Sequence, residues 1–194
     1  MFKRRTPRSR LWHLKELFWP SMGWVRTFKY VRYRILRLSD TTHKIAGGLA
    51  VGAAISYSPL VGTHFVQAAI FSYIFRFNIL ASLVGTAVGN PWTFPFIWWS
   101  GYELGAYIFS IFGWQNGAKL PDEMTLGILW EIVKTQPMQI FLPWMLGGYL
   151  AGFVLWFPAY FIYYALVRGG RAARRQVRRH NLHKAAQEVT GQKE

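Results

Sequence analysis

The chain has no cysteine among its 194 residues. This absence excludes disulfide bridges, thiolate catalysis and metal sites built from thiolates. The sequence also lacks the paired histidines of a zinc-binding helix, the elbow motif of a nucleophilic serine, a phosphate-binding loop and an acidic cluster suited to a metal. We therefore expect neither a metal nor a cofactor. An enzyme is the less favoured class, and a membrane enzyme that uses His64 stays open as an alternative.

Acidic residues are scarce, and the middle of the chain has little charge of either sign. The chain has 23 Lys and Arg but only eight Asp and Glu, which gives a net charge of +15. Only Arg76, Lys119 and Lys134 among the basic residues lie within residues 45–166. Because a bilayer core tolerates charge poorly and short basic flanks stay in the cytoplasm, this pattern predicts an integral membrane protein. We expect a basic cytoplasmic or interfacial region at 1–44, a transmembrane domain at 45–167 and a basic cytoplasmic tail at 168–194.

The high net charge also bears on partners. Basic ends beside apolar segments are typical of contact with anionic lipid headgroups. Nucleic acid is not expected as a partner, because the sequence contains no nucleic-acid-binding motif.

Long uninterrupted apolar runs are lacking as well. The runs at 45–57, 64–75, 79–89 and 95–112 are each shorter than the roughly 20 residues of a simple crossing. The run at 45–57 ends at Ser58-Pro59 and the run at 79–89 at Asn90-Pro91, and only the last segment, 138–167, is longer. Backbone exposed at such breaks must be shielded by protein or line a wet cavity. We expect an all-α membrane protein, a compact multi-helix bundle with short broken or re-entrant helices.

The order of these segments predicts a topology. Residues 45–75 would enter the membrane and return, 79–112 would cross outward and 138–167 would cross back, so both termini would be cytoplasmic. If 45–75 were instead a single kinked crossing, Arg76 would lie on the far side. Before them, apolar residues at helical spacing over 24–38 predict an amphipathic helix, which lies either at the membrane interface or against the rest of the protein. A second short helix is expected at 124–134.

Glycines recur four residues apart in the apolar region. Such pairs allow helix backbones to approach closely, and they permit a homodimer. The pairs are Gly48 with Gly52, Gly85 with Gly89, Gly101 with Gly105, and Gly148 with Gly152.

Two of these pairs introduce similar stretches, Gly-Leu-Ala-Val-Gly at 48–52 and Gly-Thr-Ala-Val-Gly at 85–89, each followed by prolines. If this is a repeat, the two breaks form one site, in which helix ends face a substrate.

Polar side chains gather near the breaks. They are candidates for substrate contact, although Ser, Thr and Asn often satisfy backbone groups freed by proline, and we slightly favour that interpretation for them. His64 and Gln67 lie one helical turn apart, and imidazole exchanges protons near neutral pH, so His64 is the best candidate for proton coupling. The candidate substrate-binding residues are Pro59, Gly62, Thr63, His64, Gln67, Asn78, Asn90, Pro91 and Thr93.

Several of these motifs occur together in one family. The elements are Ser58-Pro59 followed by Gly62-Thr63-His64, then Arg76-Phe77-Asn78, Gly89-Asn90-Pro91-Trp92-Thr93, and Gly101 with Gly105. Over residues 38–166 the chain resembles the bacterial inner-membrane family called domain of unknown function 2062. The resemblance implies a small multi-spanning membrane protein with the motifs at 59–64 and 90–93 at its centre. Some relatives are linked to glycosyltransferase domains, which suggests envelope or lipid-linked sugar metabolism, but the 194 residues contain no such domain.

Two functions from different classes follow. The first is transport or flipping of a small or lipid-linked anionic substrate, held by the helix starts near Thr63 and Thr93 and coupled to protons through His64. The second is a non-catalytic membrane scaffold or assembly partner in envelope biogenesis, for which the basic ends recruit partners and the breaks serve packing only.

Overall fold

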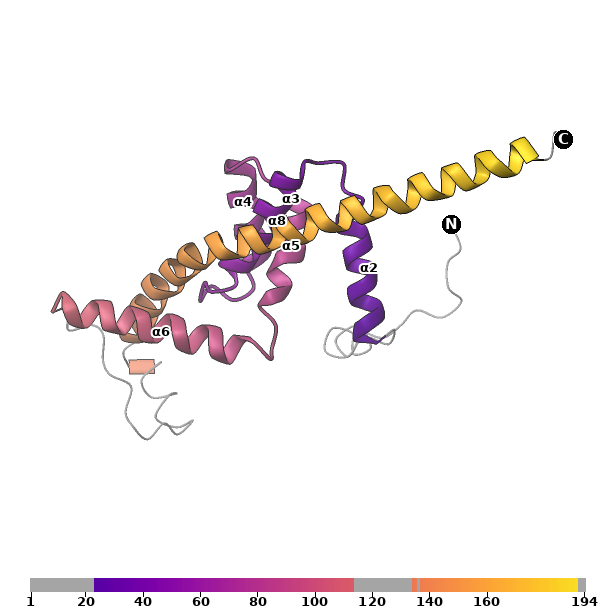
Figure 1. The fold of residues 1–194 in the computed structure, drawn as a ribbon. Coiled ribbons are helices and arrows are strands. Elements are labelled where there is room, and N and C mark those ends of the chain that lie inside the picture. Colours follow the sequence, from indigo (N-terminus) through magenta and orange to yellow (C-terminus); the bar gives the residue numbers. More distant parts are fainter. Residues whose placement is uncertain (1–22, 114–133, 136, 192–194) are drawn as a thin grey trace. The chain divides into compact units, whose positions relative to one another are not determined.

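The computed structural model describes residues 23–113, 134–135 and 137–191. These residues form six α-helices and one 3-10 helix, with no strand among them, so the all-helical prediction is confirmed (Figure 1). The chain divides into two compact units, residues 1–38 and 39–194. In the first unit, α2 (Trp24–Leu36) confirms the helix expected at 24–38. The helix expected at 124–134 lies almost entirely outside the described residues.

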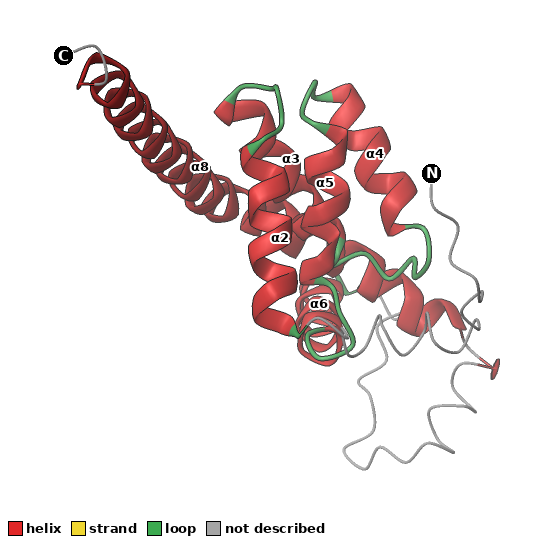
Figure 2. Cartoon of the chain, turned by 90° about the vertical axis from the view of Figure 1, so that its right-hand side faces the viewer, coloured by secondary structure: helices red, strands yellow, loops and turns green. Residues whose placement is uncertain are grey.

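Helix α3 (Thr42–Ile55) is the buried centre of the second unit. Thr41 caps it, since its hydroxyl accepts a hydrogen bond from the Lys44 amide at 3.3 Å. Every residue from Ile45 to Ala53 is buried, and most are small or β-branched. Around it pack α4 (His64–Ile74), α5 (Ile79–Gly85) and the short η1 (Thr86–Val88). Figure 2 shows α3, α4 and α5 side by side with nearly parallel axes.

Glycines make the contact between α3 and α5 very close. A methyl group at Gly52 would overlap the carbonyl oxygen of Ser82, and one at Gly85 would overlap the carbonyl oxygen of Leu49. Such backbone contact leaves no room for a side chain on either helix. The expected role of these glycines in helix packing is therefore confirmed within the chain.

The remaining two helices meet through a second set of glycines. Helix α6 (Phe94–Ile111) packs on α8 (Pro137–Gly191), where a methyl group at Gly105 would overlap the backbone of Pro143. Helix α8 also packs along α3, where Gly148 contacts the carbonyl oxygen of Tyr57 and Gly152 contacts that of Ala54. Further along, the Tyr160 hydroxyl lies 2.7 Å from Nδ1 of His43. Helices α3 and α8 are therefore antiparallel.

Helix α8 is continuous over 55 residues, although it contains Pro143 and Pro158. Each proline removes a hydrogen bond of the helix, which favours bending. Figure 1 shows the first turns of α8 bending away from the line of its long C-terminal part. The helix does not stop at Val167, where the apolar segment ends, but continues through the basic residues that follow.

One helix of the described residues is long and apolar enough to cross a membrane, the Pro137–Lys184 part of α8. Little of its apolar window is buried within the protein. Helix α4 and the α5–η1 segment are apolar but shorter. The multi-pass arrangement expected from the sequence stays a prediction.

We predict opposite effects from alanine at two glycines. Gly105→Ala should lower the free energy of unfolding by roughly 1–3 kcal/mol, because the methyl group overlaps the backbone of Pro143. Gly169→Ala should raise it by about 0.5–1 kcal/mol, because Gly169 lies inside α8 with open space around it. Thermal unfolding of the detergent-purified protein measures both. Equal effects of the two substitutions would contradict the packing of α6 on α8.

Candidate functional site

The break after α3 is closed by a ring of hydrogen bonds between three side chains. The fully buried Ser58 hydroxyl donates to the Tyr149 hydroxyl at 3.2 Å. The Tyr149 hydroxyl donates to Oε1 of Gln67 at 2.7 Å, and Nε2 of Gln67 donates back to Oγ of Ser58 at 3.3 Å. The ring joins the break to α4 and α8. Because each member both donates and accepts, the buried hydroxyls are satisfied without a ligand.

His64 and Thr63 are also held by this break. Nε2 of His64 lies 2.9 Å from the carbonyl oxygen of Ser58, so Nε2 carries the proton of this hydrogen bond, since a carbonyl only accepts. The Thr63 hydroxyl donates to the carbonyl oxygen of Leu60 at 2.7 Å and accepts from Nε2 of Gln67 at 2.6 Å. Gly62 has a φ of 87°, which favours glycine at this turn.

Pro59 and Pro91 lie within the two breaks. The second break satisfies backbone groups of its own. Oδ1 of Asn90 accepts from the amides of Trp92 at 3.0 Å and Thr93 at 3.2 Å. The Thr93 hydroxyl accepts from the Asn90 amide at 3.0 Å and donates to the carbonyl oxygen of Val88. These are the local side-chain-to-backbone bonds that Asn and Thr commonly form in turns. The structure thus gives Asn90 and Thr93 a structural role at the break.

The two breaks lie beside each other, as the repeat predicts. Oγ of Ser56, at the end of α3, accepts from the Gly89 amide at 3.2 Å. The imidazole of His64 contacts the ring of Phe94, with centroids 5.9 Å apart. The starts of α4 and α6 are therefore neighbours.

An aromatic column continues from this contact into the α6–α8 interface. The Phe94 ring stacks on Trp98 with centroids 4.8 Å apart, and Trp98 meets Trp144 at 5.1 Å. The buried indole N–H groups of Trp98 and Trp144 have no acceptor among the described residues. This column fixes the start of α6 against α8.

Asn78 lies elsewhere, at the opposite end of α3. Its Oδ1 accepts from the backbone N–H of Ala81 at 2.8 Å and so caps α5. Its backbone N–H donates to the carbonyl oxygen of Lys44 at 3.0 Å. The 14 residues of α3, about 21 Å of helix, separate this end from the breaks. The structure therefore does not bring Asn78 together with the other candidate residues.

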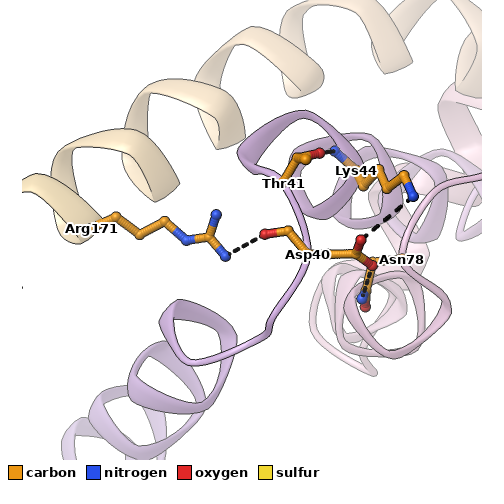
Figure 3. A network of polar contacts seen from close by, with 5 residues as sticks. All are labelled: Asp40, Thr41, Lys44, Asn78 and Arg171. Atoms are coloured by element: carbon orange, nitrogen blue, oxygen red, sulfur yellow. Dashed lines mark hydrogen bonds and ion pairs between the residues drawn. The ribbon is translucent and has the colours of Figure 1, made fainter.

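A polar network surrounds Asn78 and ties three elements together (Figure 3). Nδ2 of Asn78 donates to Oδ2 of Asp40 at 2.8 Å, and Nζ of Lys44 lies 3.6 Å from Oδ1 of the same carboxylate. From α8, Arg171 donates to the carbonyl oxygen of Asp40 at 2.8 Å and to the Thr42 hydroxyl at 3.3 Å. The network anchors the start of α3 to both α5 and α8.

Sequence reasoning missed Asp40, although a signal was present. Asp40 is the only acid between Glu16 and Glu103, and it directly precedes the Thr41 cap of α3. An isolated acid among many basic residues is expected to find a cationic partner.

An apolar groove runs between α3, α4 and α8, with a volume of about 780 Å³. Tyr149, a member of the hydrogen-bonded ring, lines it, and so do Phe75 and Phe77 from the turn that follows α4. The groove therefore extends from the first break to the end of the unit where Asn78 lies. Its remaining lining is aliphatic and aromatic and includes Val51, Ile55 and Trp156. The spacing of apolar residues along the chain did not reveal it, because its lining comes from four helices, with Phe109 of α6 added to residues of α3, α4 and α8.

Comparison with known proteins identifies one family. A family model described as an uncharacterized protein conserved in bacteria (DUF2062) matches residues 25–176. No curated protein and no solved structure matches the chain.

We predict that Tyr149→Phe lowers the free energy of unfolding by about 1–3 kcal/mol, because it removes the acceptor of the buried Ser58 hydroxyl and the donor to Oε1 of the half-buried Gln67. The matched control is Tyr73→Phe, at a residue that is 77% exposed, with an expected change within about 0.5 kcal/mol. The double variant with Ser58→Ala should cost less than the sum of the single changes. Denaturation in detergent is measured for the parent protein, for the three single variants and for the double variant. Strict additivity of Tyr149→Phe and Ser58→Ala would contradict the ring.

Proposed function

The chain belongs to this bacterial family (DUF2062), and we propose that it is a multi-pass protein of the inner membrane that transports or flips a small or lipid-linked anionic substrate. The observation that carries the proposal is that two helix breaks meet and that the first of them bonds Tyr149, which lines an apolar groove. A polar site next to an apolar groove suits a substrate with a charged and an apolar part.

The proposed topology has both termini in the cytoplasm. The exposed arginines that follow Val167 on α8 favour a cytoplasmic location for that end. Because α3 is antiparallel to α8, the Asp40 network then lies on the cytoplasmic side. Helix α3, at about 21 Å, is shorter than the roughly 30 Å hydrocarbon core, which supports a re-entrant hairpin formed by α3 and α4.

The starts of α4 and α6 are the proposed anion-binding groups. No side chain caps either start, so amide groups of the first turn of α4 are free to bind an anion. Thr63 is exposed there and His64 is half-buried. Since Nε2 of His64 is held by the Ser58 carbonyl, Nδ1 is the ring nitrogen through which His64 would couple proton and anion binding.

The scaffold is the second candidate, and one observation favours it. The polar side chains at the breaks already bond one another, which packing alone would explain. The basic C-terminal part of α8 is exposed and would then bind the partner protein. The exposed apolar faces of α6 and α8 would contact lipid or a second copy of the chain.

The absence of cysteine makes a direct test of the site straightforward. We predict that single cysteines at Val61, His64 and Thr93 react with a membrane-impermeant thiol reagent in intact or opened cells, because a transport site must contact water. Val61, which is 58% exposed, is chosen rather than the neighbouring candidate residue Gly62, because the positive φ of Gly62 disfavours cysteine. Ser58→Cys, at a fully buried residue, is the unreactive control, and Val177→Cys on the exposed end of α8 is the reactive one. Protection of all three site cysteines in a folded protein would favour the scaffold.

Substitutions separate the two functions. We predict that His64→Ala and Asn90→Ala each slow the flipping of fluorescent phosphatidylglycerol in proteoliposomes, whereas deletion of residues 174–194 leaves it unchanged. The deletion starts after Arg171 so that the bonds to Asp40 and Thr42 remain. A scaffold gives the reverse pattern in cells: the deletion abolishes function and both alanine variants are tolerated.

A further inference from the structure

The turn after α4 has an arginine where glycine is favoured. Arg76 has a φ of 57°, and it is the one non-glycine residue with a positive φ in the described part of the chain. The turn is closed by hydrogen bonds from the Phe77 amide to the Ser72 carbonyl at 2.8 Å and from the Arg76 amide to the Tyr73 carbonyl at 3.1 Å. This pattern commonly ends a helix with glycine in the left-handed conformation. The backbone conformation at this position therefore favours glycine over the arginine that occupies it.

Both neighbours of Arg76 line the apolar groove. They are Phe75 and Phe77, so the turn places a cation in the chain between two groove-lining aromatic residues. Arg76 is exposed, and its guanidinium forms no hydrogen bond or ion pair with the residues that the structure describes. Within the described part of the chain, no contact of this side chain explains why arginine stands at the turn.

The surrounding charge favours an anion at this end of the groove. Asp40 is the one acid of the network next to the turn, and its carboxylate is already paired with Lys44. Arg171 also bonds the backbone at Asp40, so the cations exceed the acids there even without Arg76. A ligand that complements this end is therefore negatively charged.

We propose that the groove holds the hydrocarbon tail of an anionic lipid and that Arg76 binds its phosphate-bearing headgroup. The groove follows α8 from Leu142 to Phe157, which is roughly 22 Å of helix, and its lining includes no charged side chain. It is open along exposed groove residues such as Phe75, Phe153 and Phe157, which would admit a tail from the side. Guanidinium forms paired hydrogen bonds with phosphate, which makes arginine the suitable cation.

This inference deepens the proposed function by naming the class of substrate, and it adds a second anion-binding position at the end of the groove opposite the helix breaks. It rests on the proposed function only in identifying the bound lipid as the transported molecule. An apolar helix of a partner protein is the competing occupant. Such a partner would need neither the phosphate nor the unpaired arginine.

The experiment compares phosphatidylglycerol with phosphatidylcholine on the full-length protein in detergent, with binding followed by native mass spectrometry. We expect phosphatidylglycerol to bind about tenfold more tightly, and Arg76→Gly to remove this preference, as expected for the loss of one charge-assisted contact. Without lipid, the melting temperature of Arg76→Gly should be equal to or higher than that of the parent protein, because glycine suits the turn. The matched control, Arg178→Gln, removes one exposed charge of α8 and should leave the preference unchanged.

A second measurement locates the tail without altering the fold. Phosphatidylglycerol with bromine on its acyl chain should quench tryptophan fluorescence, and Trp156→Phe should remove part of that quenching, because Trp156 lines the groove. Glycerol phosphate, which has no tail, should not compete with the lipid.

Three results would each overturn the inference: equal binding of the two lipids, an unchanged preference in Arg76→Gly, or quenching that does not depend on Trp156. Binding as expected in a protein that does not flip lipid would refute the proposed transport while leaving the lipid site intact. Conversely, flipping that depends on His64 but not on Arg76 would refute the identification of the bound lipid as the transported molecule and leave transport intact.

Discussion

Backbone-to-backbone contact between helices is the constraint on which the second unit depends. Glycines on α3, α5, α6 and α8 face carbonyl groups of neighbouring helices, and several of these contacts leave no room for one methyl group. Such contact gains van der Waals energy from many atoms at once and does not require burial of large side chains. It also explains why α3 consists mainly of small residues and is nevertheless the most buried helix. Large aromatic residues are thereby left to the outside of the helices and to the groove.

The close packing has a second effect, on the polar residues at the breaks. When helices end inside a tightly packed unit, their last carbonyl and first amide groups need partners within reach. Asn90 and Thr93 supply such partners from a distance of a few residues. Ser56 bonds Thr86 and Gly89 at the other break, and Tyr149 reaches Ser58 from α8. The same residues therefore hold the breaks in place and bring the starts of α4 and α6 together. We propose that a structural and a functional role coincide at the breaks, although their side chains are already bonded.

Much of the fold could be predicted from local sequence because proline, glycine and capping residues mark where helices stop and start. The starts of α4 at His64 and α5 at Ile79 follow directly from the preceding turn residues, and the glycine pairs mark contact surfaces. Features formed by residues distant in sequence could not be predicted in this way. Tyr149 lies 91 residues from its partner Ser58, and the groove takes its lining from several helices. Asn78 was grouped with the breaks because it is near them in sequence, yet α3 separates them in space.

The continuity of α8 has a mechanical consequence. One helix of 55 residues, about 80 Å long, carries at one end the contact with α6 and at the other a series of exposed arginines. Between these two ends, Arg171 bonds α8 to the start of α3, and this contact is the point about which the helix would pivot. A force applied to the basic arm beyond this point exerts a torque on the part that packs against α3 and α6. Because no loop interrupts the helix, this torque would reach Tyr149 and its hydrogen bonds at the first break, and Pro143 and Pro158 are the positions at which α8 would bend.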